Sequence, residues 1–455
     1  MAVSPARAAA FEILLRVERD QSYASELLHS ARMAKFSPSD HGLATELVMG
    51  VLRWRSWLDQ RLARASSQKL ERLDPEVLAA LRLGMYQLQF LSRVPGRAAI
   101  FESVELVKAA RKRSAAPFTN AVLRKAAAEP AADVFAGIER AALPQTLAET
   151  SAHPGWMVAR WVERYGLAGA IQICLHDQAV PVTAIHVQAI HVQPIHIQND
   201  QADGELAREG IAFSPGLLLS SARRVTSGDV AKARAFREGR VSIQDEASQL
   251  VAILVGRGER ILDCCAAPGR KTALMAARNP DAKVFAADLY PHRTRLLRAL
   301  TRQRNIHVIA ADARQLPFHA GFDRILADVP CSGTGTLSRN PEIKWRLRPE
   351  DLPDLQTRQI AILRSALAQL APDGRLVYST CSLEGEENEA VVEAALAGTA
   401  DFRIIDCQGQ LEELQRSGEL SWKDIASLLA GPYLRTIPGV HPCDGFFAAM
   451  IGRAP

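Results

Sequence analysis

The sequence predicts a multidomain protein with an all-α bundle over residues 1–140, a small α/β part over 141–240 and an α/β domain over 241–455. Apolar residues recur at three- and four-residue spacing through residues 4–128, which is the helical period. From residue 241 onward, strand-like and helical segments alternate, as in a doubly wound parallel sheet. At 455 residues and 48% hydrophobic composition, the chain is long enough for about three domains with their own cores.

Composition excludes several classes of protein. We find no run of about 18 apolar residues. Within the first 20 residues, Arg16, Glu18, Arg19 and Asp20 stand where a signal peptide needs an apolar core. The seven cysteines form no CxxC pair, which argues against a disulfide framework or a zinc site. We therefore expect a cytoplasmic protein without a membrane span or metal, and we expect it to be a monomer.

Positive charge is concentrated at the N-terminus. Residues 1–130 hold 20 Lys and Arg against 13 Asp and Glu, a net charge of +7, while the remainder of the chain has a net charge of −2. A basic module is typical of proteins that bind a polyanion such as RNA. Charge alone does not distinguish this from helices with solvated basic faces.

The helical part shows recognisable helix starts. Ser37-Pro38 and Asp74-Pro75 each combine a capping side chain with a proline in the first turn. The strongly apolar stretch LDPEVLAALRLGMYQLQFL predicts a central helix of the bundle. Residues 129–150, rich in Ala, Glu and Pro, are expected to form a linker or a loosely packed helix.

Residues 151–240 contain mixed signals. A helix is expected at 153–166 and a strand at 181–188, followed by three near-copies of AIHVQ at a period of five. The copies carry His186, His191 and His196, but a five-residue step places them together neither on a helix nor on a strand. A duplicated strand or loop segment is therefore a better interpretation than a metal site.

Strand ends in the C-terminal part carry polar and reactive residues. The expected strands are residues 260–265, 283–288, 307–312, 322–328 and 374–379. In a parallel sheet, the ligand lies beyond the carboxyl ends of such strands.

The first three strand ends suggest a nucleoside ligand. The first is followed by the small-residue turn CCAAPGRKT, whose backbone amides can approach a ligand closely; Arg270 stands where a phosphate loop needs glycine, so an NTPase is excluded. The second ends at Asp288, a suitable position for an acid that binds ribose hydroxyls, and the third at Asp312, which could accept from an adenine amino group. Each acid alone is equally explained as a helix cap.

The fourth and fifth strand ends bring an acid and two thiols into one crevice. Asp328 and Cys331 follow the fourth strand and Cys381 follows the fifth, and these two strands are expected to be neighbours. A single cysteine is usually a small buried hydrophobe, but two at adjacent strand ends favour a reactive pair. Spacing does not decide which of the two is the nucleophile.

Several motifs resemble those of a known enzyme family. DCCAAPGRKT, DVPCSGTGTLSRNPEIKWR, YSTCSLEGEENEAVV and PGVHPCDGFFAAMIGR are similar to motifs of the RNA cytosine-5 methyltransferases, and residues 61–91 and 118–129 resemble the antitermination-factor NusB-like domain. The combination is found in the Sun/Fmu family of bacterial 16S ribosomal RNA methyltransferases. The resemblance implies a Rossmann-like catalytic domain with a mostly parallel, seven-stranded sheet, behind a NusB-like bundle.

The resemblance also implies roles for the site residues. Cys381 is the expected nucleophile towards cytosine C6, Cys331 the helper in breaking the covalent adduct, and Asp328 the partner of base N3. The reactive thiol also needs a nearby positive charge, for which Lys271 is one candidate. The methyl donor S-adenosylmethionine (SAM) is expected to contact the following residues: Cys265, Ala266, Ala267, Pro268, Gly269, Arg270, Lys271, Asp288, Asp312 and Asp328.

The sequence departs from the family at two places. Arg270 replaces a usual glycine, and the AIHVQ repeat lengthens a normally short strand region. Both departures affect details of binding rather than the reaction.

Three other functions are compatible with parts of this pattern. A transfer RNA cytosine-5 methyltransferase has the same chemistry, and a DNA enzyme is chemically possible, although the NusB-like part favours RNA. A non-catalytic RNA-binding assembly factor would have no need of Asp328, Cys331 and Cys381.

Overall fold

The computed structural model describes residues 3–129, 133–187, 195–301, 303–318 and 321–454. Contacts divide the chain into two compact units. The first, the helical unit, contains residues 1–181 together with Leu337–Leu347; the second, the α/β unit, contains Val182–Thr336 and Arg348–Pro455.

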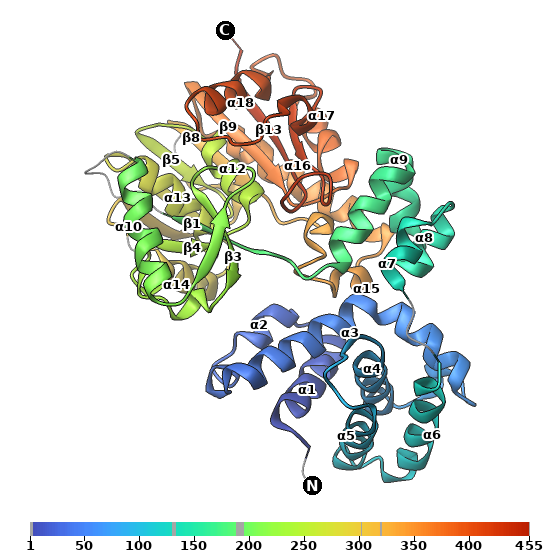
Figure 1. Cartoon of the computed structure of the whole chain (residues 1–455). Coiled ribbons are helices and arrows are strands. Elements are labelled where there is room, and N and C mark those ends of the chain that lie inside the picture. Colours follow the sequence, from blue (N-terminus) through green and yellow to red (C-terminus); the bar gives the residue numbers. More distant parts are fainter. Residues whose placement is uncertain (1–2, 130–132, 188–194, 302, 319–320, 455) are drawn as a thin grey trace. The chain divides into compact units, whose positions relative to one another are not determined.

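The helical unit is all-α, as the apolar periodicity predicts (Figure 1). Ser37 caps one long helix by accepting a hydrogen bond from the Asp40 amide at 3.2 Å, and Pro38 stands in its first turn. The expected central helix is confirmed, and its residues Ala79 to Gln87 are buried throughout. The helices of this bundle are α1 (Pro5–Arg19), α2 (Ala24–Leu28), α3 (Pro38–Ala65), α4 (Pro75–Phe90), α5 (Gly96–Ala109) and α6 (Ala116–Ala127).

Three further helices complete the N-terminal part of this unit. The stretch expected to be a linker or loose helix contains α7 (Val134–Glu139) and α8 (Pro144–Thr150), and α9 (Gly155–Gln178) follows. α9 includes the helix expected at 153–166 but continues beyond Gly166, whose φ of 71° bends it.

A short segment from the second half of the sequence also belongs to the helical unit. It contains α15 (Ile343–Arg346), where the buried Lys344 donates hydrogen bonds to the carbonyls of Arg53 at 2.7 Å and Ala152 at 3.0 Å. The Trp345 indole donates to the carbonyl of Leu52 at 2.6 Å. Burial lowers the pKa of Lys344 to about 7. These bonds attach the segment firmly to α3.

The α/β unit begins with a small antiparallel sheet in the strand order β2-β3-β1-β4. Its elements are β1 (Thr183–Val187), α10 (Ile195–Arg208), β2 (Ala212–Pro215), β3 (Ala222–Ser227), α11 (Arg234–Arg237) and β4 (Val241–Ile243). The first AIHVQ copy forms β1, whereas the third begins α10, and the second lies outside the described residues. His186 is buried with its Nδ1 3.2 Å from Gln249 Oε1, and His191 lies outside the described residues.

The main sheet has the order β11-β12-β13-β9-β8-β5-β6-β7, with β10 beside β13. Its strands are β5 (Arg260–Asp263), β6 (Lys283–Asp288), β7 (Ile306–Ala310), β8 (Phe322–Asp328), β9 (Leu370–Thr380), β10 (Phe402–Ile405), β11 (Leu429–Ala430), β12 (Tyr433–Thr436) and β13 (Phe446–Arg453). β5 to β9 are mutually parallel, and β13 is antiparallel to β9. Within the described residues the sheet thus has nine strands and not seven, since β11 and β12 extend it.

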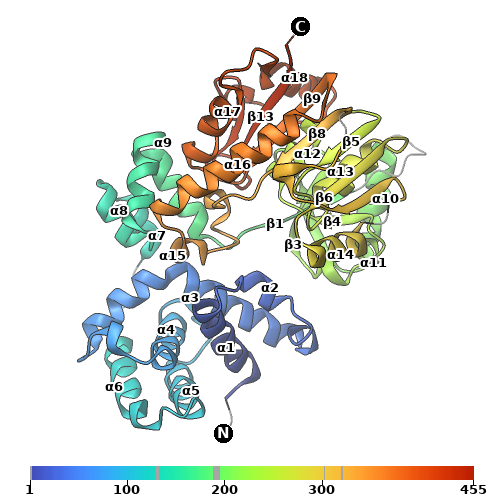
Figure 2. The ribbon, with the colours of Figure 1, turned by 180° about the vertical axis from the view of Figure 1, so that it is seen from behind.

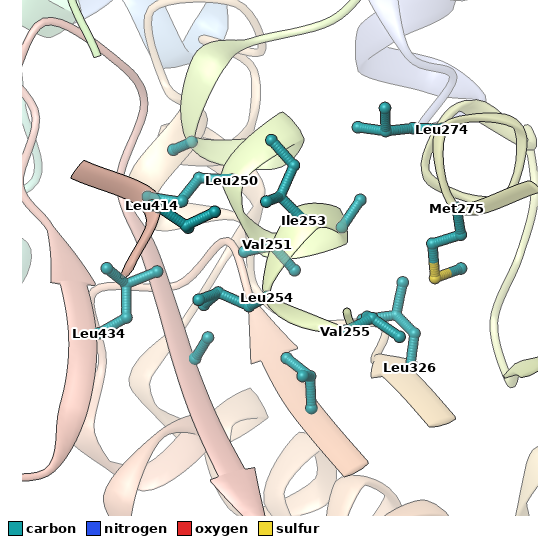
Figure 3. Close-up of a cluster of buried hydrophobic side chains, with 14 of the residues drawn as sticks. Leu250, Val251, Ile253, Leu254, Val255, Leu274, Met275, Leu326, Leu414 and Leu434 are labelled. Atoms are coloured by element: carbon teal, nitrogen blue, oxygen red, sulfur yellow. The ribbon is translucent and has the colours of Figure 1, made fainter. Parts of the chain in front are cut away.

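Helices cover both faces of this sheet (Figures 1 and 2). They are α12 (Glu246–Leu254), α13 (Arg270–Arg278), α14 (Pro291–Leu300), α16 (Leu352–Leu367), α17 (Glu389–Leu396) and α18 (Cys407–Arg416). Side chains alternate along the strands: Val377 belongs to the core under α12, α13 and α18, and its neighbour Tyr378 to the core under α16 and α17. Figure 3 shows the first core, where Leu250 and Leu254 of α12 lie near Leu414 and Leu434.

The limits of the two units differ from those that the sequence suggested. Contacts separate the units after Pro181, whereas composition suggested limits at residues 140 and 240. Whether three parts fold separately stays a prediction, because compactness does not test independent folding. Within the described residues, no helix combines the length and the apolar character needed to cross a membrane.

Candidate active site

The site lies at one edge of the main sheet, because parallel strands end together. β5 ends at Asp263, β6 at Asp288 and β8 at Asp328, with β9 ending at Thr380 beside β8. β8 and β9 are neighbours, as the sequence analysis expected. The loops after these strands therefore start from adjacent points.

The loop after β5 forms a close-fitting turn into α13. Gly269 adopts a left-handed conformation with φ 105°, and a Cβ there would lie 2.9 Å from Thr301 and 3.2 Å from Leu297. The Ala266 amide donates to the carbonyl of Ala287 at 2.8 Å. Glycine is thus required here, and the turn is anchored to β6. Arg270, at the first position of α13, is exposed.

Asp288 joins this turn to the end of β6. Its Oδ2 accepts a hydrogen bond from the Ala267 amide at 3.3 Å, and its Oδ1 accepts from the Tyr290 amide at 3.1 Å. The side chain is largely buried, and the two bonds leave further lone pairs on both oxygens. A carboxylate held in this way is suited to bind a diol.

Asp312 has a different environment. It caps a short 3₁₀ turn by accepting from the Arg314 amide at 2.9 Å, and the Arg314 side chain binds both its oxygens, the shortest contact being 2.6 Å. Arg314 lowers the pKa of Asp312. The capping interpretation of this acid is therefore confirmed, while a contact with adenine stays a prediction.

Lys271 and Asp328 form an ion pair at the carboxyl end of β8. Lys271 Nζ donates to Asp328 Oδ2 at 2.7 Å, and the Ser379 hydroxyl donates to Asp328 Oδ1 at 2.7 Å. Burial alone would lower the pKa of Lys271, but Asp328, with a further contribution from Cys381, raises it above the ordinary value. Lys271 is therefore a stable cation whose charge acts on both Asp328 and Cys381.

The two cysteines of the neighbouring loops come together. Cys331 Sγ and Cys381 Sγ lie 3.3 Å apart, and both residues are partly exposed. The hydrogen bond with Cys381, followed by burial, raises the pKa of Cys331 well above that of an ordinary thiol. The structure thus brings together Lys271, Asp328 and both thiols, the four residues that the sequence analysis selected for chemistry.

A buried carboxylate below the thiols was missed from the sequence. Glu387 is fully buried and accepts hydrogen bonds from the amide of Ser332 and the side chain of Gln359. It stands in the acidic run EGEENE, where nothing distinguishes it from surface glutamates. Only its contacts identify it.

Asp263 is a second buried acid that was not selected. Its Oδ2 accepts from the Thr272 hydroxyl at 2.7 Å, and burial raises its pKa to about 7. The nearby charge of Asp328 acts in the same direction. Asp263 therefore ties α13 to the end of β5.

Comparisons with known proteins agree with this architecture. The model of the family "16S rRNA methyltransferase RsmB/F" matches residues 251–452, and the NusB family model matches residues 4–128. A probable ribosomal RNA small subunit methyltransferase B of Bacillus subtilis is 33% identical over 98% of both chains. The ribosomal RNA small subunit methyltransferase B of Pseudomonas putida is 35% identical over 83% of this chain and 85% of its own.

Solved structures show the same fold. The crystal structure of PH0851 covers 99% of both chains with a TM-score of 0.78 at 20% identity. A methyltransferase homolog from Pyrococcus horikoshii covers 68% of this chain and 97% of its own, with a TM-score of 0.54 at 25% identity.

Proposed function

This chain belongs to the RsmB/F family of 16S rRNA methyltransferases, and from that premise we propose that it transfers a methyl group from SAM to C5 of a cytosine in 16S ribosomal RNA. The observation that carries the proposal is the thiol pair, with Cys331 and Cys381 3.3 Å apart beside the Lys271–Asp328 ion pair. Methylation of an amine or a protein side chain needs no such pair. Cytosine C5 is too weak a nucleophile to take the methyl group by itself, so a thiolate must first add to the neighbouring C6.

The residues present fit SAM at the turn after β5. The Gly269 turn has no room for a side chain, and the Asp288 carboxylate is oriented by two backbone amides. Residues 265–271 would hold the amino acid end, Asp288 the ribose, and Asp312 would lie near the adenine. When bound, SAM supplies an electrophilic methyl group on a sulfonium.

The first step assigned to the protein is covalent addition. The thiolate of Cys381 forms a bond from Sγ to cytosine C6, and the electron pair of the C5–C6 double bond moves to C5, which can then accept the methyl group. Asp328, in its protonated form, donates a hydrogen bond or the proton itself to N3 of the base as the thiolate adds, which withdraws charge from the ring, and it takes the proton back when the adduct breaks. The positive charge of Lys271 acts on the sulfur of Cys381 as it attacks.

The second step reverses the addition. A base removes the C5 proton, its electron pair restores the C5–C6 double bond, and the C6–S bond breaks with its pair returning to Cys381. The Cys331 thiol, 3.3 Å from this sulfur, is close enough to hydrogen-bond the departing thiolate. The target cytosine must leave any stack to reach these groups, and the basic helical unit would hold flanking phosphates.

The test is bisulfite sequencing of ribosomal RNA from cells with and without the gene. Loss of one 5-methylcytosine in 16S RNA is expected. An unchanged ribosomal pattern would direct the search to transfer RNA and contradict the substrate assignment.

Complementation separates catalysis from an assembly role. A gene encoding C381A should fail to restore the modification, whereas C407A, which changes a buried core cysteine far from the thiol pair in sequence, should restore it. Restoration by C381A would favour the assembly factor and contradict the covalent mechanism.

A further inference from the structure

Glu387 is a carboxylate buried without an ion-pair partner among the described residues. It ends a short 3₁₀ turn, Gly385–Glu387, and none of its surface is exposed. Its Oε1 accepts from the Ser332 amide at 2.8 Å and from Gln359 Nε2 at 2.9 Å. Its Oε2 accepts from the hydroxyls of Ser332 and Ser382, the latter at 2.5 Å. Four donors thus replace water around a buried anion.

These donors come from both cysteine loops. Ser332 directly follows Cys331, and Ser382 directly follows Cys381, so each loop is held to the same carboxylate. The hydroxyls of Ser332 and Ser382 lie 3.0 Å apart, and the Gly335 amide donates to the carbonyl of Cys381 at 2.9 Å. The same carboxylate thus contacts both loops that carry the two sulfurs.

The charged groups that act on Cys331 all have the same sign. The groups that act on it are Cys381 after β9, Glu387, and Asp328 at the end of β8, all of which oppose a negative charge on its sulfur. Tyr378 of β9 also interacts with Cys331 electrostatically. The cation of the site, Lys271 of α13, is bound to Asp328 and acts on Cys381.

We propose that Glu387 is a positioning residue that holds the two cysteine loops together and, through its negative charge, keeps Cys331 in the neutral thiol form. The inference rests on the proposed function, because it gives the two thiols different tasks: Cys381 reacts as a thiolate, and Cys331 remains a hydrogen-bond donor for its departure. Two adjacent thiols of equal acidity would compete for the same cytosine.

The substitution E387Q separates charge from scaffold. The glutamine carbonyl can accept from the Ser332 amide and Gln359, and its amino group can donate to the two serine hydroxyls, which can also act as acceptors. Geometry is thus retained while the charge is lost. By contrast, E387A would leave the Ser332 amide and Gln359 without an acceptor and is not informative about charge.

The experiment measures the pH dependence of alkylation of Cys331 by iodoacetamide, with each cysteine quantified separately by peptide mass spectrometry. In the unsubstituted protein, the midpoint for Cys331 should lie above about 8.5, the value of an ordinary thiol. In E387Q it should fall by about one pH unit or more, because a like charge has been removed. E387D, which keeps the charge on a shorter side chain, should retain a high midpoint.

Three outcomes overturn the proposal. They are a Cys331 midpoint at or below that of an ordinary thiol in the unsubstituted protein, an unchanged midpoint in folded E387Q, and an equal fall in E387D, which would assign the effect to geometry. The unsubstituted protein and E387D keep the test decisive if E387Q does not fold. Alkylation requires neither RNA nor SAM, so a failure here is distinct from a failure of the methylation assay.

Discussion

At the scale of single residues, the site depends on opposite charges in a partly enclosed space. Lys271 and Asp328 are bound at 2.7 Å, with the side chain of Lys271 14% exposed and that of Asp328 24% exposed. Neither has a second charged partner of opposite sign at salt-bridge distance within the described residues. Removing one leaves the other uncompensated in low dielectric.

The substitution K271M should therefore reduce methylation by about 100-fold or more, because both Asp328 and the nucleophile lose their cation. Initial rates of methyl transfer from labelled SAM to 16S RNA measure this. K423M, at an exposed lysine, is the matched control and should retain the rate. Equal activity of K271M and K423M would contradict the role of the ion pair.

Asp263 makes stability depend on pH in an unusual direction. Its pKa is about 7 in the folded chain and near 3.8 when unfolded, because burial disfavours the carboxylate. Between these values the folded state holds a proton that the unfolded state releases, so this residue lowers the unfolding free energy as pH rises from about 4 to 7. Thermal unfolding of D263N, which stays neutral, should lack this contribution. If the melting temperatures of D263N and of the unsubstituted protein change with pH in the same way across this range, the assignment is refuted.

Four of the site residues could be predicted from the sequence, but the buried Glu387 could not. Asp328, Cys331 and Cys381 were identifiable because each stands at or just after a strand end, and Lys271 because it ends the small-residue turn that follows another strand. Glu387 was not, since a buried carboxylate and a solvated one are the same letter in an acidic run. Burial of a polar group depends on donors distant in sequence, here Ser332 and Gln359.

At the scale of elements, alternation and strand-end chemistry predicted the sheet well. The limits of β6 and β8 coincide with the predicted ranges, 283–288 and 322–328. β9 begins four residues earlier than expected, at Leu370, because its pairing with β8 continues across an irregularity that has no local signal. The AIHVQ repeat shows the same limit, since its first copy forms β1 and the similar third copy, PIHIQ, begins α10.

The loop that carries Cys331 passes very close to the turn before β13. A Cβ on Gly335 would lie 2.2 Å from the carbonyl oxygen of Gly445, and the Gly445 amide donates to the carbonyl of Gly335 at 2.8 Å. G335A should therefore lower the unfolding free energy by about 1–3 kcal/mol and reduce methylation, because the backbone must move.

Denaturant unfolding together with the methylation rate tests this expectation. G409A, in α18 where no atom lies within 4 Å of an added Cβ, is the control and should be neutral or slightly stabilising. A G335A protein as stable and active as G409A would show that the close approach is unimportant.

At the scale of the whole molecule, charge is divided between parts with different tasks. The excess of positive charge in residues 1–130 was visible in the sequence and predicts that RNA binding is driven largely by phosphate contacts. The logarithm of affinity should then fall linearly with the logarithm of salt concentration, with a slope of about −0.7 to −0.9 per phosphate contacted.

Filter binding of 16S RNA between 50 and 200 mM salt measures the slope. Replacing Arg124 and Lys125 at the end of α6 by glutamine should make it less steep. Replacing the exposed Arg403 and Arg416 by glutamine, in the α/β unit, is the control. Equal slopes for both double variants would contradict a special role of the basic N-terminal part.

The segment Leu337–Leu347 has a consequence for synthesis. The chain completes α9 at Gln178, yet the helical unit still lacks Lys344, which binds the carbonyls of Arg53 and Ala152, and Trp345, which binds that of Leu52. A nascent chain that has reached residue 181 therefore lacks these contacts until more than 150 further residues have been translated. N-terminal folding on the ribosome can begin early but ends late, and no single cut in the gene separates the two units as complete modules.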